Sequence, residues 1–186
     1  KCLTLKYMTL VDVSMNIAIE LDEFDETNVY FNKPVRNTVI DESNFLRLTY
    51  SNEMFSMNGI YLNVVIDVSN KEKHYNKYKC SFNLNKNYLV VHKLTQIEAK
   101  ILKRIHLHGK NPVKKIRQQL NCGNIKLFTD NSIPSAANNY TLKMSGIWET
   151  DTEYGITYKF IDVSETHTHN ARHTSRLSKR TLESHS

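Results

Sequence analysis

The sequence predicts a mostly β fold with one inserted helix pair, and three observations support this prediction. Several stretches alternate apolar and polar residues with period two, the pattern of half-buried strands. A stretch near 94–120 changes to helical spacing instead. The 186 residues, 40% hydrophobic and 24% charged, suffice for one domain with its own core. We therefore expect a single β-rich domain over 1–163 and a flexible basic tail over 164–186.

Three runs predict strands most clearly. Their inward residues are Val13, Met15, Ile17, Ile19 and Leu21; Ile60, Leu62, Val64, Ile66 and Val68; and Tyr78, Cys80, Phe82 and Leu84. Shorter candidates are Leu3–Leu10, Phe45–Tyr50, Tyr88–Val91 and Ile125–Thr129. Near the C-terminus the alternation predicts a hairpin that turns at Glu149–Glu153, with Gly155 permitting a bend or bulge. Its inward residues are Tyr140, Leu142, Met144 and Trp148, then Tyr154, Ile156, Tyr158 and Phe160.

Helical spacing begins after His92. The first apolar face consists of Leu94, Ile97, Ile101, Leu102 and Ile105. Thr95–Glu98 fits a capping box at the helix start, and Gly109 suits the stop. Asn111 then reads as an N-cap with Pro112 at the first helical position. The second helix carries Val113, Ile116 and Leu120 and is closed by Gly123.

Positive charge is concentrated in the middle third of the chain. The net charge is −5 over residues 1–70, +12 over 71–126 and −1 over 127–186. A basic segment of this kind favours an anionic partner, although a solvated basic face is the alternative. The cations of this segment interleave with Tyr75, and bases stack on aromatic rings while cations track phosphates. The predicted nucleic-acid contacts are Lys71, Lys73, Tyr75, Lys77, Lys79, Lys100, Lys103, Arg104, Lys110, Lys114, Lys115 and Arg117.

Enzyme signatures are absent from the sequence. It contains no phosphate-binding loop, dinucleotide fingerprint, nucleophile elbow or zinc-protease motif, so we expect no enzyme, cofactor or metal. The acidic cluster over 20–26 lacks the glycine and spacing of a calcium loop and is expected to be solvated. Histidines and arginines over 167–180 are read as an extension, with a phosphate-contacting arm as the alternative. Three cysteines, far apart and odd in number, indicate a reducing compartment.

The segment Leu142–Ile161 resembles a signature of uncharacterised proteins from insect-infecting DNA viruses and virus-derived mobile elements. These proteins are associated with viral single-stranded DNA-binding proteins. The resemblance covers about twenty residues strongly, and Leu94–Ile161 diffusely. It implies a viral or mobile-element origin, and it assigns no binding residue.

Together these features predict an oligonucleotide-binding-like barrel or a β-sandwich with an inserted helix pair. The expected function is binding and protection of single-stranded nucleic acid, DNA above all, during viral or mobile-element replication. Two alternatives stay open: a virus-encoded structural, capsid-type assembly protein, and a duplex-DNA-binding regulator that uses the helix pair. No apolar run is long enough to span a membrane, so no membrane partner is expected. The cysteine pattern and the resemblance lead us to expect an intracellular location, in the host nucleus or cytoplasm, with the virion and a homo-oligomer left open.

Overall fold

The computed structural model describes residues 18–39, 42–128 and 138–163. The described chain is mostly β, which confirms the predicted β-rich class with two helices. In chain order the elements are β1 (Ile19–Glu20), the 3-10 turn η1 (Glu26–Asn28), β2 (Val29–Phe31), β3 (Val35–Arg36), β4 (Asn44–Ser51), β5 (Ser56–Asn58), β6 (Ile60–Val65), β7 (Val68–His74), β8 (Lys77–Phe82), α1 (Tyr88–Ile105), β9 (Asn111–Val113), α2 (Lys115–Asn121), β10 (Asn124–Phe128), β11 (Asn139–Glu149) and β12 (Glu153–Asp162).

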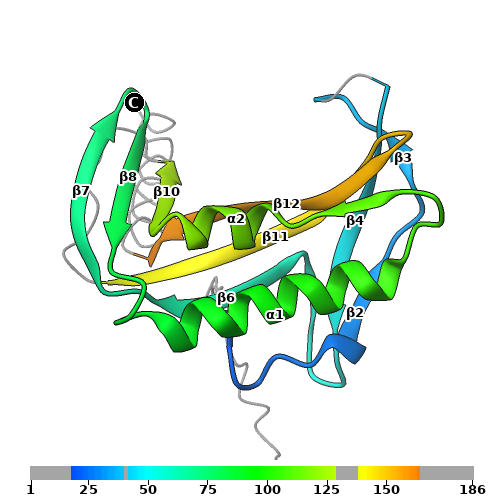
Figure 1. Cartoon of the computed structure of the whole chain (residues 1–186). Helices are drawn as coiled ribbons and strands as arrows, with labels where there is room; N and C mark the ends of the chain where they lie inside the picture. Colours follow the sequence, from blue (N-terminus) through cyan, green and yellow to red (C-terminus); the bar gives the residue numbers. More distant parts are fainter. Residues whose placement is uncertain (1–17, 40–41, 129–137, 164–186) are drawn as a thin grey trace, which may run out of the picture.

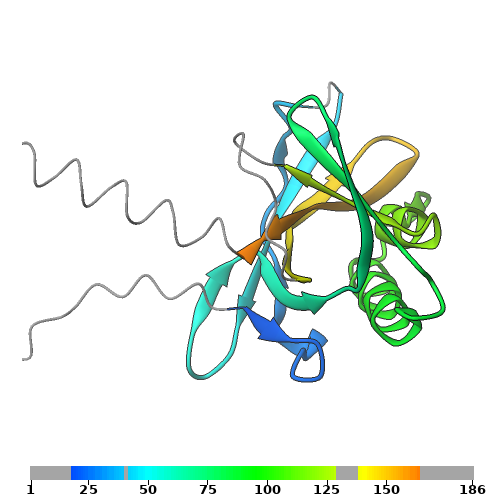
Figure 2. The same ribbon diagram turned by 90° about the vertical axis from the view of Figure 1, so that its left-hand side faces the viewer.

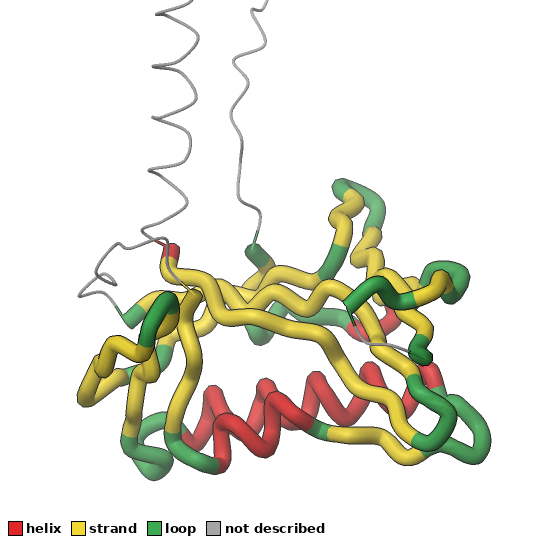
Figure 3. Tube along the Cα trace, turned by 90° about the horizontal axis from the view of Figure 1, so that it is seen from above, coloured by secondary structure: helices red, strands yellow, loops and turns green. Residues whose placement is uncertain are grey.

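Within the described ranges, the strands form one mixed 12-stranded sheet in which β11 and β12 are central. Its main path runs β1-β6-β11-β12-β10-β8-β7, and β4 joins the far half of β11 with β2, β3 and β5 around it. The sheet curves strongly, and both helices lie along its inner side (Figures 1, 2 and 3). Each strand of the main path therefore has one face toward the helices and one face outward.

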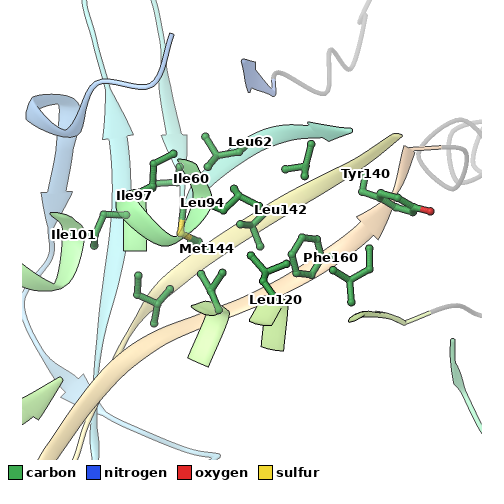
Figure 4. Close-up of a cluster of buried hydrophobic side chains, with 14 of the residues drawn as sticks. Ile60, Leu62, Leu94, Ile97, Ile101, Leu120, Tyr140, Leu142, Met144 and Phe160 are labelled. Carbon is green, nitrogen blue, oxygen red and sulfur yellow. The ribbon is translucent and has the colours of Figure 1, made fainter. Parts of the chain in front are cut away.

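The core fills the space between the helices and the inner face of the sheet. It combines Ile60 and Leu62 from β6, Leu142 and Met144 from β11, and Phe160 from β12 (Figure 4). The helical spacing in the sequence is confirmed, because Leu94, Ile97, Ile101 and Leu102 of α1 and Ile116 and Leu120 of α2 are buried. Burial of this apolar surface is the main stabilising contribution to the fold.

The first helix starts about two turns earlier than the sequence predicts. Tyr88–Val91, expected as a short strand, is the first turn of α1, and the N-cap is Asn87 rather than Thr95. The Asn87 side chain accepts a hydrogen bond from the Asp67 amide at 2.8 Å and so ties the helix start to the sheet. The Thr95 hydroxyl instead donates to the His92 carbonyl, one turn back. Packing of Val91 into the core outweighs the β propensity of this apolar run.

The second helix starts later than predicted. Asn111 and Pro112 are not its N-cap and first residue, because Asn111–Val113 forms β9, parallel to β12. The Asn111 amide donates to the Thr152 carbonyl at 2.8 Å, so the segment is drawn to the sheet. The helix α2 begins at Lys115 and has no cap from its own N-cap side chain.

A β-bulge separates the two halves of β11. The register with β12 shifts between Met144 and Gly146, and one extra residue reverses the face of every residue beyond it. The predicted burial of Trp148 is confirmed at 6% exposure, but the residue is not on the face of Met144. Trp148 lies on the outer face, where its indole covers Gly155.

The other predicted strands are confirmed in part. The run 60–68 splits between β6 and β7, and Leu84 lies past the end of β8 and is 40% exposed. Of the run 13–21 only Ile19 and Glu20 form a strand, while 13–17, Leu3–Leu10 and the tail 164–186 lie outside the described residues. No helix in the described ranges is long and apolar enough to cross a membrane.

Candidate nucleic-acid interface

The predicted contacts divide between two sides of the molecule. The segment from Lys71 to Lys79 forms the β7–β8 hairpin, and the helix cations lie on α1, α2 and the residues between them. The hairpin is part of the sheet, whereas the helices cover its inner side (Figure 2). The structure therefore does not bring the twelve predicted residues together into one surface.

Within the hairpin, strand alternation sends the lysines to different faces. Lys71 and Lys73 pair in register with Cys80 and Tyr78, which are buried, so both belong to the inner face of the sheet. The Lys71 ammonium lies 5.8 Å from the ring centroid of Tyr140. Lys77 and Lys79 alternate with the buried residues of β8 and therefore belong to the outer face of the sheet. Tyr75 occupies the hairpin tip in a left-handed conformation and is 97% exposed.

Several helix cations already have partners within the chain. Lys100 forms an ion pair of 2.9 Å with Glu26, in the acidic segment expected to be solvated. Lys110 donates to Glu149 at 2.5 Å and to the Thr150 carbonyl at 2.7 Å. The Lys115 ammonium lies 4.5 Å from the ring centroid of Trp148. These contacts hold the helix layer and the N-terminal segment to the sheet.

The remaining helix cations are more accessible. Lys103 and Arg104 are exposed on α1, and Arg104 lies 5.9 Å from the ring centroid of Phe31. Arg117 is exposed on α2, while Lys114 is half-buried immediately before that helix. None of these four side chains lies on the outer face of the sheet.

A row of lysines crosses the outer face of the sheet. Lys143 of β11 pairs in register with Lys159 of β12. Lys126 of β10 precedes Leu127, the register partner of Phe160, and so lies beside Lys159. Lys126 in turn pairs with Lys79 of β8. Four neighbouring strands, about 4.8 Å apart, thus each place one lysine in the same row.

Aromatic rings flank this lysine row. Lys143 pairs with Tyr61 of β6, with its ammonium 4.8 Å from the ring centroid. Lys77 lies 4.7 Å from the ring centroid of Phe128, which is 47% exposed. A depression of about 370 Å³ connects the row to the hairpin tip, lined by Tyr75, Lys79 and Lys126 among others. The surface therefore offers both cations and exposed rings.

Carboxylates are scarce around the lysine row. The outward positions next to the row on these four strands hold Ser81, Asn124, Thr141 and Thr157, together with Lys77, Phe128, Gly146 and Ile161. The carboxylate of Glu153 lies farther along β12 in the same phase. The first carboxylate in the row is Glu72 of β7, which pairs with Lys79 at the edge. Like charges that face each other across strands destabilise a sheet, so the row suits an anionic ligand.

Sequence reasoning missed three of the four lysines in this row. Lys126 was not in the predicted set, and Lys143 and Lys159 lie in the C-terminal segment whose net charge is −1. Each is a single polar residue in an alternating strand, which is the ordinary pattern of a solvated face. Only the pairing of the strands makes these positions adjacent.

The described residues contain no candidate metal centre. Among the ranges that the structure describes, no group of three or more His, Cys, Asp or Glu side chains could hold a metal ion. Burial raises the pKa of the Cys80 thiol to about 11, which disfavours the reactive thiolate. In comparisons with known proteins, no family model, curated protein or solved structure matches the chain.

Proposed function

We propose that the chain binds single-stranded nucleic acid across the outer face of its sheet, without a catalytic step. The observation that carries this proposal is the row of Lys143, Lys159, Lys126 and Lys79 on adjacent strands. Spaced cations can follow the phosphates of a strand, and exposed rings provide stacking that tolerates any base. The proposed binding surface belongs to an open sheet rather than a closed barrel, because the main path of strands ends at β1 and at β7.

The flanking rings favour a single strand over a duplex. Tyr75, at the hairpin tip, and Phe128 are exposed beside the lysines. A base can stack on such rings only when it is free of its complementary strand, because duplex bases stack on each other. The resemblance of Leu142–Ile161 supports replication of a virus or mobile element as the setting for this role.

The test compares two charge-matched double variants. Lys143→Glu/Lys159→Glu alters the row, whereas Lys103→Glu/Arg117→Glu makes the same change in net charge on the helix side. Binding of a labelled oligo-dT and of a matched duplex is measured by fluorescence anisotropy over a salt series. For a single strand, each lost phosphate contact should reduce the slope of log affinity against log salt by about 0.7.

The row variant should lose affinity and have a shallower slope, whereas the helix variant should retain the wild-type slope. The same helix variant tests the contacts predicted from sequence on α1 and α2. Equal losses in the two variants would show that net charge alone is responsible and would overturn the proposed interface. Tighter binding of the duplex would overturn the single-strand preference.

A further inference from the structure

A cavity of about 430 Å³ opens on the outer face beside the lysine row. Its lining includes Val35, Phe45 and Thr157 together with two arginines, Arg36 and Arg47. The Phe45 ring lies over Gly146, where a Cβ atom would be only 2.3 Å from the ring. The absence of a side chain at Gly146 therefore leaves room for the Phe45 ring beside this backbone, as one wall of the cavity.

Strand register connects this cavity to the lysine row. Arg47 pairs with Gly146, and Gly146 pairs with Thr157, so these residues form the next row across β4, β11 and β12. Thr157 and Lys159 lie on the same face of β12, about 6.8 Å apart along the strand. A chain of phosphates that follows the lysines would thus pass the mouth of the cavity.

Charge at the cavity matches the charge of the row. Arg36 and Arg47 are both exposed, and neither forms an ion pair with another described residue. A guanidinium group binds a phosphate through two parallel hydrogen bonds, and its planar face also stacks on bases. Cavities of this size, apolar with a few convergent polar groups, are typical of small-ligand sites.

We infer that this cavity receives one unstacked nucleotide of the bound strand, an inference that rests on the proposed function. The base lies against Phe45 and Val35, Arg47 binds the adjacent phosphate, and Arg36 adds positive charge from the next position of β3. The lysine row then supplies affinity along the backbone, and the cavity fixes the position of one nucleotide at its end. Readout of this kind, by stacking on a ring beside cations, is how unpaired bases are held by proteins.

The experiment uses mononucleotides as probes of the cavity. Binding of dTMP and of deoxyribose 5-phosphate is followed by saturation-transfer NMR in the wild type, in Arg36→Gln/Arg47→Gln and in Lys143→Glu/Lys159→Glu. We expect dTMP to bind the wild type about fivefold or more tightly than the sugar phosphate, because only dTMP can stack. The arginine variant should weaken dTMP binding about tenfold or more. The lysine variant should change it less than twofold, roughly the effect of a screened surface charge.

An independent readout uses oligo-dT and thermal unfolding. The arginine variant should keep its melting temperature, since both side chains are exposed, and lose oligo-dT affinity. If oligo-dT binding depends on the lysine row but dTMP binding ignores the arginines, the cavity inference fails and the proposed function stands. If dTMP binds through the arginines while no oligo-dT binding depends on the row, both are overturned, because the cavity is then a site for free nucleotides.

Discussion

Glu98 of α1 supplies the cap that α2 lacks. Its two carboxylate oxygens accept the amides of Ile116 and Arg117 at 2.9 and 2.8 Å, in the first turn of α2. These are orphan donors that no residue within the helix can satisfy. The side chain is fully buried, and this desolvation raises the pKa of the carboxyl above its usual value, although both amides oppose the shift. The Glu98 carboxylate thus joins the two helices, and its contribution to the unfolding free energy depends on pH.

The raised pKa predicts that stability falls as pH rises. Because the folded chain binds the Glu98 proton more tightly than the unfolded chain, unfolding free energy is lost from about pH 4.5 upward, through the raised pKa. Glu98→Gln removes this titration and also leaves one amide without an acceptor, at a cost of about 1–3 kcal/mol. Urea unfolding at several pH values from 4.5 to 8 measures both effects. Parallel pH profiles for the variant and the wild type would show that Glu98 does not titrate in this range.

At the scale of elements, the β11–β12 hairpin shows what the sequence can and cannot predict. Period-two alternation located both strands and the turn, because alternation follows directly from the pleat. The sequence indicated Gly155 as a position that permits a bend or bulge, whereas the bulge lies between Met144 and Gly146. Its position depends on β4 and β6, which pair with different halves of β11. That pairing is a tertiary contact, so no local sequence pattern indicates the position of the bulge.

Deletion of Ser145 tests the role of the bulge. Without this residue, either Ile147 or Met144 must leave the core, because a one-residue slip turns every following side chain to the other face. We expect the deletion variant to lose about 3 kcal/mol or more of unfolding free energy, the cost of removing a large apolar side chain from the core. Ser145→Ala, which keeps the chain length, should change stability by less than about 0.5–1 kcal/mol. Chemical denaturation followed by the emission of Trp148 measures both variants, and equal stabilities would contradict the proposed role.

Helix ends were predicted less well than helix faces, for a related reason. The inward residues of α1, such as Leu94 and Ile101, follow from spacing alone. Its start at Asn87 depends on the hydrogen bond from Asp67, and the change of Asn111–Val113 from helix to strand depends on the neighbouring β12. These tertiary contacts outweigh the local capping signals at Thr95 and Pro112.

At the scale of the whole molecule, the candidate site is a product of the topology. The sequence located Lys79 through the local density of charge, but Lys143 and Lys159 stand alone in their strands. Antiparallel pairing of β11 with β12 and parallel pairing of β12 with β10 make them neighbours. The cavity has the same origin, because Arg47 and Thr157 meet only through β11. Single-sequence reasoning can suggest an anionic partner, but it cannot place the surface that would bind it.

The lysine row also predicts a dependence of stability on salt. Lys159 lies between Lys143 and Lys126, so Lys159→Gln should relieve repulsion on both sides and raise unfolding free energy by about 0.5–1 kcal/mol. Added salt should stabilise the free wild type for the same reason and should stabilise the variant less. Thermal unfolding at low and high ionic strength measures this difference. Lys103→Gln on the helix side is the matched control, and a similar gain there would remove the row as the cause.

Salt should consequently act in opposite directions on the fold and on its complex. Screening relaxes the crowded ammonium groups of the free protein, whereas the same screening weakens their hold on a polyanion. The sheet is therefore locally frustrated, and a chain selected for stability alone would replace one of these lysines by a neutral residue. Under the proposed function, phosphates that bind between the ammonium groups should release this strain. Ligand binding should then raise the melting temperature in part by completing the charge balance that the folded sheet lacks.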